Sequence, residues 1–281
     1  MKKIAFIILT IVLVATMMLA FTGCAQATTQ DQLRDIWLPY EKYVYDVVGN
    51  DQTGTYTVEI IRNDASTITI GDMTLNDVKE GYIIKSTLEI EGAVHETACY
   101  MQKTNGASLF VPIASYTNNP VIENGKVAYN NVISGKYEGK HFKYTKVEYG
   151  AREEGEIALA SPYYDNNQIH QLIRAMHTFS ASFSFNVPLA TENELARLTV
   201  SSNNTEEITW GENTTTKCNV LHLSRQTLVN GASQILYYSE SPVKVDGWDL
   251  KHVLIRFKEP IGNDDYMVYT LKSISRTPDQ N

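Results

Sequence analysis

The sequence lacks the short motifs that mark common catalytic and metal sites. It contains no GxSxG, no P-loop, no HExxH and no CxxC, so it offers no motif for a serine hydrolase, a nucleotide hydrolase, a zinc peptidase or a dithiol redox enzyme. Its six histidines are spread along the chain without the spacing of metal ligands. We therefore expect a protein that is not an enzyme and that uses no cofactor and no metal.

Basic residues are also scarce, with 24 Lys and Arg against 32 Asp and Glu and a formal net charge of -8. An acidic protein of this kind is a poor partner for nucleic acid and for anionic lipid head groups in general. The 281 residues are enough to bury a sizeable core. Seventeen tyrosines favour strands over a helical bundle.

The first 24 residues, MKKIAFIILTIVLVATMMLAFTGC, have the layout of a secretory signal. Two lysines precede an apolar run from Ile4 to Ala20, which is short for a membrane span. The ending Phe-Thr-Gly-Cys is typical of a bacterial lipobox, in which the cysteine thiol is acylated and becomes the mature N-terminus. We expect residues 1–23 to be a lipoprotein signal peptide and Cys24 to be the lipid attachment site. The alternative is an uncleaved anchor helix.

A lipid on Cys24 would hold the protein on the extracytoplasmic surface of the bacterial membrane without spanning it. Residues 24–37 would then form a lipidated tether with a short helix, and residues 38–281 one folded domain. The other two cysteines, Cys99 and Cys218, lie in predicted strands. In an exported protein they form either a disulfide or two buried free thiols, and both alternatives stay open.

Asn-Gly pairs between alternating segments predict tight antiparallel hairpins, because both turn positions require a positive φ. The three pairs are Asn105-Gly106, Asn124-Gly125 and Asn230-Gly231, and Asp246-Gly247 is a fourth candidate. Centring the turns on these pairs predicts that Ile122 faces Val127 and that Leu223 faces Tyr238. Segments such as Gly54–Ile61 alternate apolar and polar residues, which indicates strands with one dry face.

One segment, residues 165 to 177, reads as an amphipathic helix in this strand-rich chain. Asp165 and Gln168 have the spacing of a capping box. The apolar stripe at helical spacing consists of Ile169, Leu172, Ile173 and Met176. Arg174 lies off the stripe and could meet a lipid head group or a carboxylate at the helix edge, but such an arginine more often keeps its charged end in water.

A second, weaker helical pattern occurs near the start of the folded region. Leu33, Ile36 and Trp37 have helical spacing before Pro39 ends the segment. We expect a short helix there, leading out of the tether.

The order of these parts resembles a known family. The segments SPYYDNNQIHQLIRAM, KCNVLHL and YYSESP, together with the helix between two sets of strands, resemble exported DUF-type proteins of the lipoprotein-sorting (LolA/LolB-like) β half-barrel superfamily over roughly residues 38–275. The resemblance implies a strongly curved antiparallel sheet around a helix, with a concave face that holds acyl chains or another apolar ligand. It brings no catalytic residues with it.

The predicted fold is therefore mainly β, a single curved antiparallel sheet (half-barrel) with one principal helix on its concave face. The expected function is that of a membrane-anchored lipoprotein that binds a hydrophobic or lipid-like ligand, with the stripe Ile169, Leu172, Ile173 and Met176 lining the site. The alternative is an envelope scaffold that binds a protein partner, in which the same stripe is ordinary core.

Overall fold

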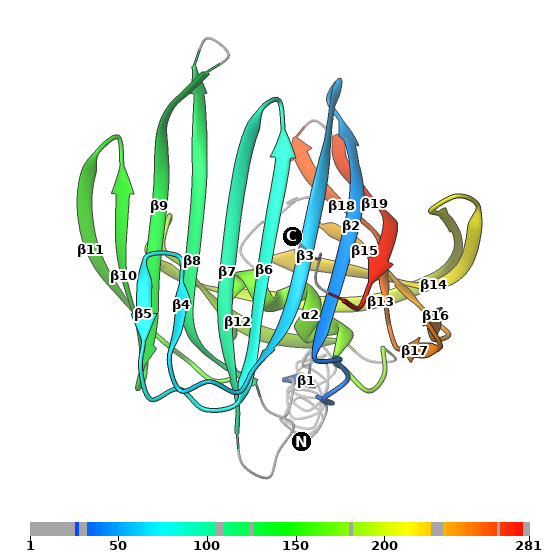
Figure 1. Cartoon of the computed structure of the whole chain (residues 1–281), viewed down its shortest axis with the longest axis horizontal. Coiled ribbons are helices and arrows are strands. Elements are labelled where there is room, and N and C mark those ends of the chain that lie inside the picture. The colour runs from blue at the N-terminus through cyan, green and yellow to red at the C-terminus, as the bar shows by residue number, and fades with distance from the viewer. Residues whose placement is uncertain are drawn as a thin grey trace, which may run out of the picture.

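The computed structural model describes residues 26–27, 33–104, 110–123, 126–179, 182–225, 233–262 and 265–277. Within these ranges fifteen strands join in one sheet, in the order β1-β12-β13-β14-β15-β18-β19-β2-β3-β6-β7-β8-β9-β10-β11 (Figure 1). Before the helix its strands are β1 Gln26–Ala27, β2 Tyr40–Gly49, β3 Gln52–Asn63, β6 Gly81–Ile90, β7 Ala93–Lys103, β8 Phe110–Glu123, β9 Lys126–Glu138, β10 His141–Glu148 and β11 Ala151–Ala158. After the helix they are β12 Phe183–Leu189, β13 Glu194–Trp210, β14 Thr214–Arg225, β15 Gln234–Ser239, β18 Leu254–Gly262 and β19 Asp265–Ser275. Two small hairpins stand apart, β4 Ile68–Ile70 with β5 Met73–Leu75 and β16 Val243–Val245 with β17 Trp248–Leu250.

Pairing of the last strand, β19, with β2 joins the two sets of strands into one surface. All neighbours are antiparallel except β1 and β12, which are parallel. The segment between β11 and β12 contains the helix, which lies inside the barrel (Figure 1). The predicted mainly-β fold with a large antiparallel sheet is confirmed. The sheet is nearly closed into a barrel, further than the expected half-barrel.

Side chains bring the two ends of the sheet together. Phe142 and Tyr144 of β10 pack in one cluster with Ala190, which follows β12. The hydroxyl of Tyr144 donates to Oδ1 of Asn193 at 3.1 Å. A Cβ on Gly155 of β11 would lie 2.3 Å from Cζ of Tyr144, so only glycine lets this ring lie flat on the neighbouring strand. The barrel is therefore closed here by packing.

Two of the predicted hairpin registers are confirmed. Ile122 pairs with Val127 across β8 and β9. In the β16–β17 hairpin Asp246 and Gly247 have φ values of 49° and 81°, the left-handed pair that a two-residue turn requires. The turn residues at Asn105-Gly106, Asn124-Gly125 and Asn230-Gly231 lie outside the described residues.

The predicted pairing of Leu223 with Tyr238 is wrong. Leu223 pairs with Gln234, and Tyr238 pairs with Asn219. The register of β14 and β15 is therefore shifted, and its centre lies two residues before the Asn230-Gly231 pair.

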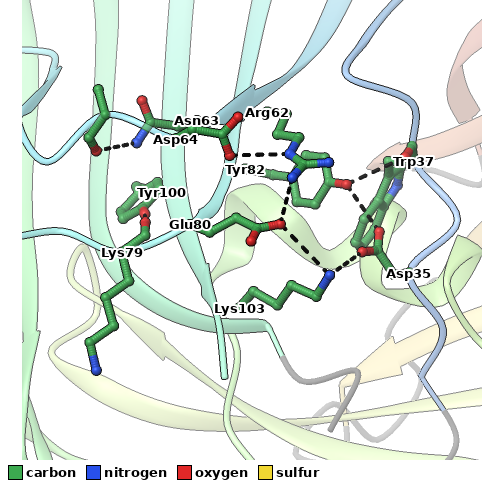
Figure 2. Close-up of polar contacts among 11 residues, drawn as sticks. Asp35, Trp37, Arg62, Asn63, Asp64, Lys79, Glu80, Tyr82, Tyr100 and Lys103 are labelled. Carbon is green, nitrogen blue, oxygen red and sulfur yellow. Dashed lines mark hydrogen bonds and ion pairs between the residues drawn. The ribbon is translucent and has the colours of Figure 1, made fainter. Parts of the chain in front are cut away.

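The prediction of a short helix near Leu33 and Trp37 is also wrong. Residues 34–38 form neither helix nor strand, and the amide of Arg34 donates instead to the carbonyl of Ala175 at 2.8 Å. Figure 2 shows how the segment is held at this end of the barrel: the Tyr82 hydroxyl donates to Asp35 at 3.0 Å, and Nζ of Lys103 lies 2.8 Å from the same carboxylate. Because its backbone partners lie on another element, the segment buries its apolar side chains without becoming helical.

The central helix is present but shorter than expected. It consists of a 3-10 turn, η2 (Asn166–Gln168), followed by α2 (Ile169–Arg174). The predicted capping box is confirmed, since the Asp165 side chain accepts from the amide of Asn167 at 2.8 Å and the Gln168 side chain accepts from the amide of Asp165 at 3.3 Å. The helix stops at Ala175 because Met176 forms a β-bridge with Leu33.

A buried ion pair attaches this helix to the sheet. Nη1 of Arg174 lies 2.5 Å from Oε2 of Glu41 on β2, and the two side chains are 1% and 0% exposed. The Glu41 carboxylate also accepts from the amide of Leu38 at 2.7 Å and from the hydroxyl of Tyr43 at 2.5 Å. Nε of Arg174 donates to the carbonyl of Lys251 at 3.0 Å. Burial lowers the pKa of Arg174, but the combined effects of Glu41, Tyr43 and Tyr45 outweigh burial and the net pKa is raised, so the guanidinium stays charged in the interior. The expectation of an Arg174 with its charged end in water is wrong.

We expect Glu41→Gln to lower the free energy of unfolding by about 3–5 kcal/mol, because it leaves a buried guanidinium without its counter-charge. Replacing the pair together, with Glu41→Leu and Arg174→Met, should recover part of that loss. Chemical unfolding in urea measures both effects.

Asp46→Asn is the matched control. Asp46 lies on the same strand and pairs with Lys272 at 3.0 Å, but the two side chains are 54% and 57% exposed, so the change should cost less than about 1 kcal/mol. Equal costs for the two substitutions would contradict the role given to the buried pair.

Candidate functional site

A cavity of about 470 Å³ lies inside the barrel where the helix begins. Strands from both halves of the chain line it, together with Asn166, Asn167, Ile169 and His170 at the start of the helix. Asn166 is exposed, so the cavity meets solvent beside the start of η2. The N-terminal segment at Leu33 contacts the other end of the helix, at Met176.

One part of the lining is aliphatic. It consists of Leu88, Ile169, Leu189, Leu198 and Leu223. These side chains come from β6, α2, β12, β13 and β14. They give the cavity the apolar surface that small-molecule sites generally have.

Three rings, which we call the aromatic wall, form another part of the lining: Tyr56 of β3, Phe257 of β18 and Tyr269 of β19. The rings of Phe257 and Tyr269 stack with centroids 4.0 Å apart, and the Tyr56 ring stands edge-on to both at 5.7 and 5.4 Å. Burial raises the pKa of Tyr56 to about 12, so its hydroxyl is neutral at physiological pH.

Glu259 of β18 is the carboxylate beside this wall. Its Oε2 accepts from the hydroxyl of Tyr269 at 3.1 Å, and its Oε1 accepts from Nε2 of Gln234 at 3.1 Å. The imidazole of His170 lies 3.3 Å from Oε1 of Gln234 and 4.8 Å from the Phe257 ring, measured between centroids. Burial lowers the pKa of His170, against the opposing effects of Gln234 and Glu259.

Arg225 of β14 is the cationic side chain of the lining, and it is already paired. Its Nη2 lies 2.7 Å from Oε2 of Glu192 and also contacts Glu194. Both acidic residues lie at the β12–β13 connection. The arginine is therefore held at the rim by two carboxylates.

The four stripe residues do not share one role. Ile169 lines the cavity. Leu172, Ile173 and Met176 are 2%, 0% and 5% exposed and belong to the main core cluster, away from the cavity lining. The difference arises because the barrel surrounds the helix: only its first turn borders the cavity, and the following turn is packed on all sides.

Cys99 and Cys218 are buried free thiols in the structure, so they do not form a disulfide. Cys99 of β7 lies beside the helix start, with its Sγ 3.7 Å from Oε1 of Gln168, whereas Cys218 lies on β14. Burial raises the pKa of both thiols, which keeps them protonated and unreactive. Cys24 lies outside the described residues.

Sequence reasoning did not find Glu259, Arg225 or the aromatic wall. In the sequence these residues cannot be distinguished from other residues of alternating strands. Only the folded barrel brings them together. The polar residue Gln234, opposite Leu223 in the ladder, was hidden by the wrong register.

In the part of the chain that the structure describes, no group of three or more His, Cys, Asp or Glu side chains could hold a metal ion. None of the helices in the described ranges is long and apolar enough to cross a membrane.

Comparison with known proteins supports the fold. No protein-family model matches the chain, and no curated protein matches it. Among solved structures, the chain is similar to a β-barrel-like protein of a domain of unknown function, DUF1849, from Brucella abortus, with a TM-score of 0.54 and 9% sequence identity. The match covers 86% of this chain and 100% of the other. At this identity the likeness shows a bacterial β-barrel-like fold and nothing about activity, and the kinship with the lipoprotein-sorting superfamily stays a prediction.

We expect the protein to lose stability as the pH falls below about 6.5, the pKa of an unfolded histidine. The folded state holds the pKa of His170 below that value, so the unfolded chain binds the proton first and acid favours unfolding. His170→Gln should reduce this loss between pH 7.5 and 5.5, measured as the free energy of unfolding in urea.

His252, whose pKa burial also lowers, should account for part of the remaining pH dependence. His177→Gln is the matched control, because His177 is exposed at the end of the same segment. A pH dependence that is the same in the wild type and in His170→Gln would contradict the assignment.

Proposed function

We propose that this protein is a non-enzymatic bacterial lipoprotein, anchored through Cys24 to the extracytoplasmic membrane surface, that binds a hydrophobic or lipid-like ligand inside its barrel. The observation that carries the proposal is the cavity of about 470 Å³ at the start of the helix. Its size falls within the range of about 300–1,000 Å³ typical of ligand sites. Its lining combines aliphatic and aromatic side chains with a larger set of polar side chains, which supports an amphipathic ligand.

The path of the chain supports the arrangement relative to the membrane. Gln26, two residues after Cys24, pairs with Phe183 at the start of β12, and two residues span at most about 7 Å. Leu33 packs at the end of the helix that is farther from the cavity. The anchored end of the barrel would therefore lie near the membrane, and the cavity would face away from it.

A second candidate is an envelope scaffold that binds a protein partner. The observation in its favour is the packing of Leu172, Ile173 and Met176 in the core. The strand β11 also ends the sheet, with a mostly exposed set of side chains. A scaffold has no need of the cavity, so ligand uptake discriminates between the two.

We expect Cys24→Ala to release the protein from membranes, because the lipid would be its anchor. Membranes washed at high salt and then fractionated give the measurement. Cys218→Ala is the control and should stay membrane-bound. Retention of Cys24→Ala in the membrane fraction would instead indicate an uncleaved anchor helix.

We expect the full chain, reconstituted in lipid nanodiscs, to take up a small neutral dye whose fluorescence rises in apolar surroundings. Empty discs provide the background. Ser224→Trp should abolish the additional signal, because Ser224 lines the cavity and an indole there would occupy it.

Ser202→Trp is the matched control, since Ser202 is exposed on the neighbouring strand β13, and it should leave uptake unchanged. An equal signal from the wild type and Ser224→Trp would contradict ligand binding in this cavity and favour the scaffold.

A further inference from the structure

The charged side chains around the cavity favour a cationic ligand over an anionic one. Among the described residues that line it, Arg225 is the single Lys or Arg and Glu259 the single Asp or Glu. Arg225 is already paired with Glu192 and Glu194. An anionic head group would therefore compete with two carboxylates for one guanidinium, and it would also approach the Glu259 carboxylate.

A cationic head group, by contrast, would be attracted to the Glu259 carboxylate. The two hydrogen-bond donors to Glu259, Tyr269 and Gln234, are both neutral, so they orient the carboxylate without cancelling its charge. Glu259 is half-buried, and a charge in such surroundings interacts with an opposite charge more strongly than in water.

The aromatic wall, with Tyr56 as its partly exposed ring, adds a second attraction of the same sign. Tyr56, Phe257 and Tyr269 line the cavity beside Glu259. The electrostatic influence of Glu259 reaches Tyr56 and Tyr269, since it raises the pKa of both hydroxyls after the larger effect of burial. Aromatic faces attract cations, and quaternary ammonium groups in particular, most strongly where water is excluded.

The helix start does not reverse this preference. The amide of Asn167 donates to the Asp165 carboxylate at 2.8 Å. That carboxylate also accepts from the hydroxyl of Tyr137 at 2.7 Å. The start of the helix thus already has an acidic group bound to the amide of Asn167, so it does not favour an anionic head group.

We infer that the cavity selects amphiphiles with a cationic head, an amine or a quaternary ammonium group attached to an apolar chain. The Glu259 carboxylate and the aromatic wall would hold the head, and the aliphatic side chains of Leu88, Leu198 and Leu223 would contact the chain. The inference rests on the proposed function, to which it adds the chemical class of the head group.

The test compares three probes with alkyl chains of similar length and different heads: hexyltrimethylammonium, hexanoate and hexanol. Each is titrated calorimetrically into the full-length protein in nanodiscs, with empty discs as the blank. We expect hexyltrimethylammonium to bind at least about tenfold more tightly than hexanoate, the size of a desolvated cation–π contact. Hexanol should lie between them.

Glu259→Gln keeps the shape of the side chain and removes its charge, so it should reduce the ratio between the ammonium and carboxylate probes by about tenfold. Glu207→Gln removes the same charge from an exposed position on β13 and should leave the ratio unchanged. A ratio that is the same in Glu259→Gln and in the wild type would overturn the inference.

The outcomes separate the two proposals. Equal binding of all three probes, or tighter binding of hexanoate, would overturn the cationic selectivity while ligand binding stands. No binding of any probe would overturn both. If tetramethylammonium alone bound as tightly as hexyltrimethylammonium, the cationic site would stand, but the apolar chain would have no role and the proposed lipid-like ligand would be wrong.

Discussion

The buried ion pair between Glu41 and Arg174 is the constraint on which the interior of this barrel depends. Both side chains are almost completely buried, and their contact joins the crossing helix to β2 at 2.5 Å. Moving two charges out of water is costly unless they face each other and find further hydrogen bonds. Tyr43, Leu38 and the carbonyl of Lys251 supply those bonds. The helix is consequently held where Nη1 of Arg174 reaches Glu41 and Nε reaches the carbonyl of Lys251.

That position accounts for the cavity. The second turn of the helix, with Leu172 and Ile173, fills the barrel on all sides, and the first turn at Ile169 leaves a space toward the aromatic wall. The hydroxyl of Tyr238 on β15 donates to the carbonyl of His170 at 2.7 Å, which gives the helix a second attachment to the sheet. A helix free to shift toward Phe257 would bury more apolar surface and close the space. The ion pair and these hydrogen bonds work against that shift.

Much of the fold could be predicted from local patterns, whereas the site could not. Alternation in the strands, the Asp246-Gly247 turn and the capping box of Asp165 and Gln168 depend on neighbours in sequence, and the structure confirms them. The pairing of Leu223 with Gln234 depends on where the connection between β14 and β15 is centred, so the predicted register was wrong. The segment after Leu33 depends on a backbone partner at Ala175, so the predicted helix was wrong. Arg174 and Glu41 are 133 residues apart, and no local pattern announces their contact. The same is true of Glu259 beside Tyr56.

The most direct test of this account is amide hydrogen exchange of residues 169–176 in the full-length protein, compared between the wild type and Glu41→Gln. In the wild type these amides should exchange as slowly as those of the central strands β2 and β3, since the helix can open only when the barrel does. In Glu41→Gln they should become faster than the strand amides, because the helix loses its attachment. Fast exchange of the helix in the wild type, or equal acceleration of helix and strands in the variant, would contradict the claim that the ion pair holds the helix in place.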